Sequence, residues 1–183
     1  MIKQKDKRSS AGGCISRRAF MFRSSAAVAG TILLPALPGM DGQALAAEIA
    51  RYPRQLIGKL SQLKAQEPLT FNYPDTGANS RCMLVKLGEM AGGGIGKDQD
   101  VVAFNTFCTH MGGDMGKTYK PVHSVLGQCP LHQSTFDLTR HGMIVSGHGT
   151  ESLPQVLLEL DSDDIYAVGM IGLIHGRYDN LQG

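Results

Sequence analysis

Two short stretches decide the fold of this chain: "CTHMGG" at Cys108–Gly113 and "CPLHQS" at Cys129–Ser134. Each joins a thiol to an imidazole, first as C-x-H and then as C-x-x-H. Each also follows a strand-like run, "DVVAFNTF" in the first case and "HSVLGQ" in the second. Loops at the tips of neighbouring hairpins would bring the two thiols and two imidazoles together, so the pattern predicts a metal site by ligand type.

Two kinds of metal centre compete for these ligands. Zinc accepts two cysteines and two histidines in a tetrahedral structural site. A 2Fe-2S cluster of the Rieske type places two cysteines on one iron and two histidines on the other. Gly112, Gly113 and Pro130 beside the ligands favour the cluster, because bridging sulfides call for backbone N–H groups from glycine-rich loops. A zinc-stabilised structural module is the alternative, and it would be colourless.

The first 46 residues are typical of an export signal rather than of the folded domain. Ser16–Met21, "SRRAFM", resembles the twin-arginine motif of the Tat pathway. A weakly apolar stretch, Ser24–Met40, and a small-x-small site at Ala44–Ala46 follow it. We therefore expect a Tat-type signal peptide at residues 1–46 and a periplasmic domain at residues 47–183.

An uncleaved membrane anchor is the alternative interpretation of this leader. The apolar stretch of about 17 residues lies at the short end of what spans a bilayer. Pro35 and Pro38 inside it weaken a spanning helix further. We therefore expect a protein that is peripheral to the membrane at most.

Composition limits the class of protein. The chain has 183 residues, of which 42% are hydrophobic and 19% charged, as in one globular domain. Beyond the leader, 11 Lys and Arg stand against 14 Asp and Glu, so the exported part is mildly acidic. This balance and the lack of a basic patch argue against nucleic acid as a partner.

The pattern along the exported part predicts a small antiparallel all-β fold. Short β-type runs alternate with clusters of Gly, Pro, Asn and Asp that close hairpins. The expected strands are Leu69–Tyr73, Cys82–Leu87, Val101–Asn105, Ser124–Gln128, Met143–Ser146, Val156–Leu160 and Ile165–Met170. Only at Arg54–Gln66 does a helix compete. Cys82 falls inside an apolar strand, where we expect a buried, unreactive thiol.

These motifs resemble a known family. "CTHMGG" with "CPLHQSTFD" resembles the cluster-binding loops of Rieske proteins. The wider pattern is similar to the small subunit of arsenite oxidase, and the resemblance covers the exported part nearly end to end. It is carried by the twin-arginine leader, "FNYPD" at Phe71–Asp75, "LPQVLLELD" at Leu153–Asp161 and "DIYAVGMIGLIHGRYDN" at Asp164–Asn180. The fold it implies is that of Rieske proteins, small antiparallel sheets with a cluster-binding subdomain.

The resemblance implies a role for each residue of the two motifs. Cys108 and Cys129 would hold the inner iron, and His110 and His132 the outer iron near the surface. Ser134 matches a serine whose hydroxyl donates to a bridging sulfide, with Gly112 and Gly113 forming the close surroundings of the cluster.

Two departures separate the chain from Rieske proteins of cytochrome bc complexes. Phe136 stands where those proteins have a tyrosine that donates to a cysteine sulfur. Gly113 and Leu131 stand where they have a disulfide between the two loops, so a third loop, Gly147–Pro154, and a partner subunit must hold the loops together. His148 in that third loop could lie over the cluster. No partner stands at ligand spacing from the four histidines outside the motifs, so we expect each to be an ordinary surface or core residue: His123, His141, His148 and His175.

The implied function is electron transfer rather than substrate chemistry. The chain would relay electrons from a large molybdopterin catalytic subunit, which oxidises arsenite, to a soluble cytochrome c or an azurin-like copper protein. The rival interpretations are the Rieske subunit of a quinol-cytochrome c oxidoreductase and an oxygenase-type Rieske ferredoxin. The first normally has the disulfide, the tyrosine and a membrane anchor, and the second works in the cytoplasm without an export leader.

Overall fold

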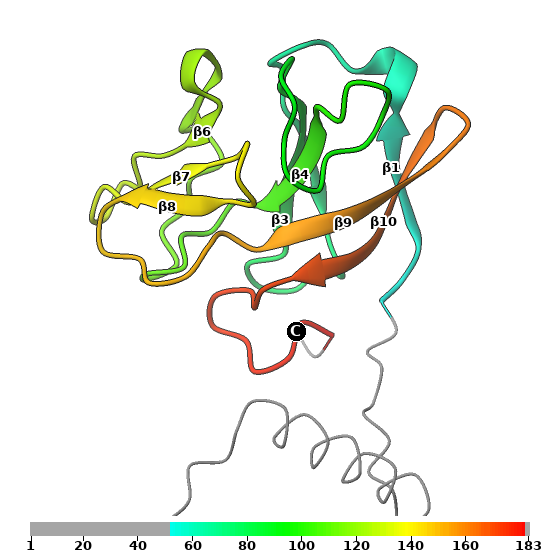
Figure 1. The fold of residues 1–183 in the computed structure, drawn as a ribbon. Coiled ribbons are helices and arrows are strands. Elements are labelled where there is room, and N and C mark those ends of the chain that lie inside the picture. Colours follow the sequence, from blue (N-terminus) through cyan, green and yellow to red (C-terminus); the bar gives the residue numbers. More distant parts are fainter. Residues whose placement is uncertain (1–51, 182–183) are drawn as a thin grey trace, which may run out of the picture. The chain divides into compact units, whose positions relative to one another are not determined.

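The fold consists of two antiparallel β-sheets, shown side by side in Figure 1. The computed structural model describes residues 52–181, so the predicted signal peptide lies outside the described residues. The strands are β1 Gln55–Lys59, β2 Leu69–Asn72, β3 Arg81–Lys86, β4 Val101–Asn105, β5 Tyr119–Lys120, β6 Val125–Leu126, β7 Thr135–Asp137, β8 Met143–Ser146, β9 Gln155–Asp161 and β10 Asp164–Ile171. Two 3-10 turns, η2 Leu60–Gln62 and η3 Pro121–His123, complete the regular elements. Within the described residues no helix is long and apolar enough to cross a membrane.

The larger sheet has six strands in the order β1-β10-β9-β4-β3-β2. Its two edge strands, β1 and β2, lie near one another. Gln55 Nε2 in β1 donates a hydrogen bond to the carbonyl of Asn72 in β2 over 3.1 Å. The sheet is therefore nearly closed, and this bond satisfies one carbonyl that an open edge would leave unpaired.

The smaller sheet has four strands in the order β5-β6-β7-β8. All four lie in sequence between β4 and β9, which are neighbours in the larger sheet. The smaller sheet is thus an insertion into one hairpin of the larger sheet. Both Cys-His motifs belong to this insertion, as expected for a cluster-binding subdomain.

Strands β3 and β4 are buried on both faces and separate two hydrophobic cores. In β4 all five residues are buried, with Val102 and Phe104 on one face and Val101 and Ala103 on the other. The first pair packs in a core that also holds Cys108 and Cys129. Because side chains alternate along a strand, one continuous apolar run supplies both cores and places the motif loops directly against one of them.

The all-β prediction is confirmed, with differences in single elements. The competing helix at Arg54–Gln66 is wrong: this stretch forms β1 and the short turn η2. The strand expected at Ser124–Gln128 shortens to β6, since Ser124 adopts a left-handed conformation with φ 49°. The short strands β5 and β7 carry too few residues to show a periodic signal, and the sequence did not indicate them.

Candidate metal centre

The first cluster loop, Cys108–Gly113, is held by its own backbone. The N–H of Gly112 donates to the carbonyl of Cys108 over 2.8 Å, and the N–H of Cys108 donates to the carbonyl of Gly113 over 2.9 Å. Gly112 has φ 68°, in the left-handed region that glycine adopts without a steric penalty. These bonds fix a tight turn with the thiol at its start and His110 at its crest.

The second cluster loop, Cys129–Ser134, repeats this arrangement. The N–H of Gln133 donates to the carbonyl of Cys129, and the N–H of Cys129 to the carbonyl of Ser134, both over 2.9 Å. Gln133 has φ 63° and so stands in the place that Gly112 has in the first loop. The two loops therefore share one hydrogen-bonding frame, although their histidines follow the cysteines at different spacings.

The two thiols lie together in the interior. Cys108 is 1% exposed and Cys129 is 2% exposed, and both pack in the core between the sheets. Burial raises the pKa of the Cys108 thiol and the neighbouring Cys129 raises it further, while the N–H of His110 and the Ser134 hydroxyl lower it. Two ionised thiolates are unfavourable in this buried environment. They become favourable when a metal cation binds in place of the two thiol protons.

The two imidazoles lie nearer the surface than the thiols. The rings of His110 and His132 meet edge to face, with centroids 4.8 Å apart. His110 is half-buried and His132 is exposed. Loss of solvation, followed by the nearby histidines, lowers the pKa of His110 and so keeps its ring in the neutral form that binds metals. The four predicted ligands thus form a buried thiol pair and an outer imidazole pair.

An unpartnered atom shows that this donor set fits a cluster. Nδ1 of His110 is buried and has no hydrogen-bond partner within residues 52–181. A buried polar atom without a partner costs free energy, which ligation of a metal would offset. A Cβ placed on Gly113 would lie 2.5 Å from the Cys129 sulfur, so any larger residue there would force the Cys129 side chain to shift.

The third loop contacts both cluster loops, as the sequence predicted. Thr109 Oγ1 donates to the carbonyl of Glu151 over 3.0 Å, and the N–H of His148 donates to Ser134 Oγ over 3.3 Å. The His148 ring lies 5.6 Å from that of His110 and 6.3 Å from that of His132, centroid to centroid. The His148 ring therefore lies beside both imidazoles.

The remaining motif residues occupy the expected surroundings. Ser134 is fully buried, and a hydrogen bond from its hydroxyl lowers the pKa of the Cys108 thiol. Phe136 is fully buried in the same core as both thiols, and its phenyl ring cannot donate a hydrogen bond. Cys82 is fully buried in the other core, and this burial raises the pKa of its thiol to about 12. Both properties agree with the predicted unreactive thiol.

His175 is the residue that sequence reasoning missed. Its ring packs on Gly112, since a Cβ at that glycine would lie 2.5 Å from His175 Cδ2. No motif spacing links the C-terminal "GLIHGR" run to the cluster loops, so only the folded chain shows this contact. The other two histidines are ordinary: His123 is exposed, and His141 Nδ1 lies 2.8 Å from Gln155 Oε1.

Comparison with known proteins places this arrangement in a family. Residues 54–157 match the model of the Rieske [2Fe-2S] domain. The iodate reductase subunit IdrB of Pseudomonas sp. (strain SCT) is 56% identical over 92% of this chain and 85% of that protein. The subunit of the same name from Denitromonas iodatirespirans is 56% identical over 93% of this chain and 89% of that protein.

A solved structure agrees with these sequence relatives. The soluble domain of Rieske protein II (soxF) from Sulfolobus acidocaldarius superposes with a TM-score of 0.57 at 27% identity, over 65% of this chain and 78% of that one. The agreement extends to the overall fold over the matched part of the chain. The chain belongs to the Rieske [2Fe-2S] family, and its cofactor is a Rieske-type 2Fe-2S cluster.

Proposed function

We propose that this chain is the electron-transfer subunit of a larger oxidoreductase. Cys108 and Cys129 hold the inner iron, and His110 and His132 the outer iron. The observation that carries this proposal is the ordering of the ligands, with two thiols buried behind two imidazoles of which His132 is exposed. When bound, the cluster supplies one-electron chemistry at a potential of roughly −150 to +300 mV.

The protein's own groups tune and protect this site. The buried core around the thiols excludes water, and the Ser134 hydroxyl and the His110 N–H compensate negative charge at the sulfur of Cys108. The exposed ring of His132 offers the path along which an electron crosses the protein surface. Substrate conversion is assigned to another subunit, because the two 56% identical relatives are themselves named as subunits of a reductase.

Iodate is the first candidate substrate of the complex. Two relatives that are 56% identical to this chain, and matched over 85% and 89% of their own length, are named as iodate reductase subunits. In such a complex electrons pass from a periplasmic donor through this subunit to the catalytic subunit. A soluble cytochrome c or an azurin-like protein is the donor in this direction.

Arsenite is the second candidate, supported by the resemblance of the motifs to the arsenite oxidase small subunit. Electrons would then run the opposite way, from a molybdopterin catalytic subunit through this chain to the soluble carrier. A quinol-oxidising role is less favoured, because Gly113, Leu131 and Phe136 replace the residues expected of Rieske proteins in cytochrome bc complexes. In either preferred case the Tat-type leader at residues 1–46 directs the folded subunit to the periplasm.

Low-temperature EPR of the natively purified complex tests these proposals. A one-electron-reduced 2Fe-2S centre is paramagnetic and the oxidised centre is silent. One sample is oxidised and mixed with arsenite alone. A second sample is reduced with dithionite, desalted and mixed with iodate. Cys108→Ala, purified the same way, controls for signals from other subunits.

The outcomes separate the candidates. Loss of the signal on iodate addition supports iodate reduction, and its appearance on arsenite addition supports arsenite oxidation. A signal that responds to neither oxyanion contradicts both substrate assignments and leaves the electron-transfer role. A complex without any Rieske-type signal contradicts the electron-transfer role itself.

A further inference from the structure

The two cluster loops differ at one equivalent position. Gly112 and Gln133 share the left-handed backbone and the same hydrogen bond, yet only Gln133 carries a side chain, which is exposed. At Gly112 a Cβ would meet the His175 ring, 2.5 Å from Cδ2 and 3.0 Å from Nε2. The first loop has glycine because an imidazole from the far end of the chain fills the space beside it.

The backbone around His175 is anchored on both sides. Residues 172–181, which we name the C-terminal strap, follow β10 without regular structure of their own. Ile174 is fully buried, and its N–H donates to Asn180 Oδ1 over 2.9 Å. The carbonyl of His175 accepts from Asn79 Nδ2 over 2.9 Å. These contacts fix where the imidazole can point.

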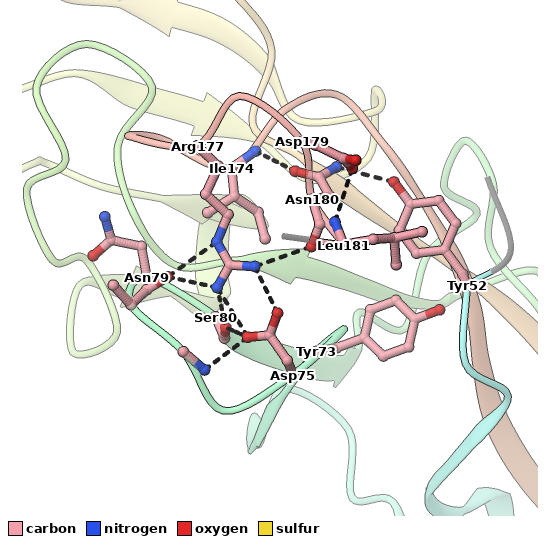
Figure 2. A network of polar contacts seen from close by, with 12 residues as sticks. Tyr52, Tyr73, Asp75, Asn79, Ser80, Ile174, Arg177, Asp179, Asn180 and Leu181 are labelled. Carbon is pink, nitrogen blue, oxygen red and sulfur yellow. Dashed lines mark hydrogen bonds and ion pairs between the residues drawn. The ribbon is translucent and has the colours of Figure 1, made fainter. Parts of the chain in front are cut away.

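Arg177 ties the strap to the segment before β3, as Figure 2 shows. Its guanidinium, 4% exposed, donates to both carboxylate oxygens of Asp75 over 2.8 and 2.9 Å. It also donates to Ser80 Oγ over 2.6 Å and to the carbonyl of Ala78 over 2.7 Å. A planar guanidinium that meets a carboxylate with two bonds is a rigid link. The strap is therefore not a free tail.

The segment before β3 is also connected to the start of the first cluster loop. Asn105 Nδ2, at the end of β4, donates to the carbonyl of Asn79 over 2.7 Å, and Asn105 Oδ1 accepts from the N–H of Phe107 over 2.9 Å. Phe107 directly precedes Cys108. Asn79 thus contacts the strap through its side chain, and its backbone is linked to the entry of the loop through Asn105.

We propose that His175 is a positioning residue for the first cluster loop: its ring packs on Gly112 and holds the Cys108–Gly113 turn, while the Arg177 network holds the strap that carries it. The inference rests on the proposed role of this loop in binding the cluster. It assigns to the C-terminal strap a function in retaining the cluster, separate from the iron ligands.

The test uses the full-length chain purified natively with its partner subunit. His175→Ala removes the ring, His175→Phe retains a flat ring of similar thickness, and His123→Ala is the matched control on an exposed histidine. The readouts are the rate at which an iron chelator bleaches the visible absorbance, the midpoint potential, and hydrogen exchange of the backbone in residues 108–113. Thermal unfolding is recorded for each variant.

His175→Ala should lose its cluster roughly ten- to a hundredfold faster than the wild type, the usual cost of removing support around a metal ligand, with faster exchange in the loop. His175→Phe should stay within about twofold of the wild type, because packing is retained. Rates for His175→Ala equal to those of His123→Ala would overturn the proposal, as would equal losses in the Ala and Phe variants. If His175→Ala does not accumulate, His175→Asn gives the same comparison with a shortened side chain.

A double variant tests the contact itself. Gly112→Ala alone should release iron fast, because its Cβ meets the imidazole and its positive φ disfavours alanine. In the double variant Gly112→Ala with His175→Ala, the clash between the new Cβ and the imidazole disappears. The increase in its rate of iron release should therefore be smaller than the product of the increases in the two single variants. Independent, multiplying effects contradict a direct contact. A wild-type complex with no cluster would instead contradict the proposed function.

Discussion

Gly113 faces Leu131 across the two cluster loops, and a Cβ on Gly113 would lie 3.1 Å from Leu131 Cγ. These are the positions that carry the disulfide in Rieske proteins of cytochrome bc complexes, as the sequence resemblance implies. In this chain the leucine occupies part of the space between the loops. The geometry of a covalent link survives, although the link is absent.

The double variant Gly113→Cys with Leu131→Cys should therefore form a disulfide in an oxidising compartment. Closing a loop of this length stabilises the fold by about 3 kcal/mol in the chain-entropy description. Mass spectrometry under non-reducing conditions detects the bond, and urea unfolding measures the gain in folding free energy. Because a Cβ at Gly113 also lies 2.5 Å from the Cys129 sulfur, Gly113→Ala alone should impair cluster retention. A double variant that stays reduced would contradict the close approach of Gly113 to Leu131.

Phe136→Tyr should raise the midpoint potential. The phenyl ring is fully buried in the core that holds both cysteines, and a hydroxyl added to it would need a partner there. A hydrogen bond to a cysteine sulfur stabilises the electron-rich reduced state. A differential of ~1 kcal/mol corresponds to about 40 mV for one electron, measured by redox titration followed by EPR. Phe71→Tyr, in β2 and packed against the other core, is the control that should leave the potential unchanged. An unchanged potential in Phe136→Tyr would mean that the added hydroxyl does not donate to a cysteine sulfur.

Replacing the cysteines one at a time should separate the ligands from the structural thiol. Cys108→Ala and Cys129→Ala should abolish the visible absorbance, because each removes a thiolate from the inner iron. Cys82→Ala should retain it and lose about 1 kcal/mol of folding free energy from reduced packing in the other core. Absorbance and iron content of the purified variants check the contrast. A coloured Cys129→Ala variant would contradict the ligand assignment.

Asp75→Asn should destabilise the domain at neutral pH and matter less in acid. Hydrogen bonds from Arg177 hold the pKa of Asp75 well below its usual range, against the opposing effect of burial. The carboxylate therefore contributes stability above about pH 4, and the contribution falls as the pH drops below the pKa of the unfolded chain, because the unfolded chain binds the proton first.

The expected loss at pH 7 is about 1–2 kcal/mol, allowing for the partial exposure of Asp75. Urea midpoints of the variant and the wild type should differ at pH 7 and converge toward pH 3. Asp98→Asn, at an exposed carboxylate, serves as the control and should show no such convergence. A difference that stays constant with pH would mean that the charge of Asp75 is unimportant.

The ligand set was readable from the sequence because thiols and imidazoles at fixed spacing leave few chemical alternatives. The strand at Val101–Asn105 was equally clear, since its first four residues are all apolar, as expected when both faces of a strand are buried. The two motifs could be placed on loops because each follows such a run. Local composition was sufficient for these features.

Contacts between distant segments were beyond the same reasoning. His175 lies in a C-terminal run that shares no spacing with the loops, and Gln133 gives no sign that its backbone is left-handed. The stretch Gln55–Lys59 forms an edge strand because it pairs with β10, although its own periodicity is ambiguous. Tertiary pairing decides in each case, and local pattern does not report it.

The shared frame of the two cluster loops has a consequence for protein engineering. Backbone amides and carbonyls at matching offsets from Cys108 and Cys129 build both turns, so the frame requires few particular side chains beyond the ligands and one left-handed residue in each turn. We expect such a loop pair to form on other pairs of adjacent hairpins only where the scaffold also replaces the contacts of the third loop and of His175. The recipient scaffold then has to supply a buried apolar core beneath the two thiols and a side chain that packs on the glycine of the first turn.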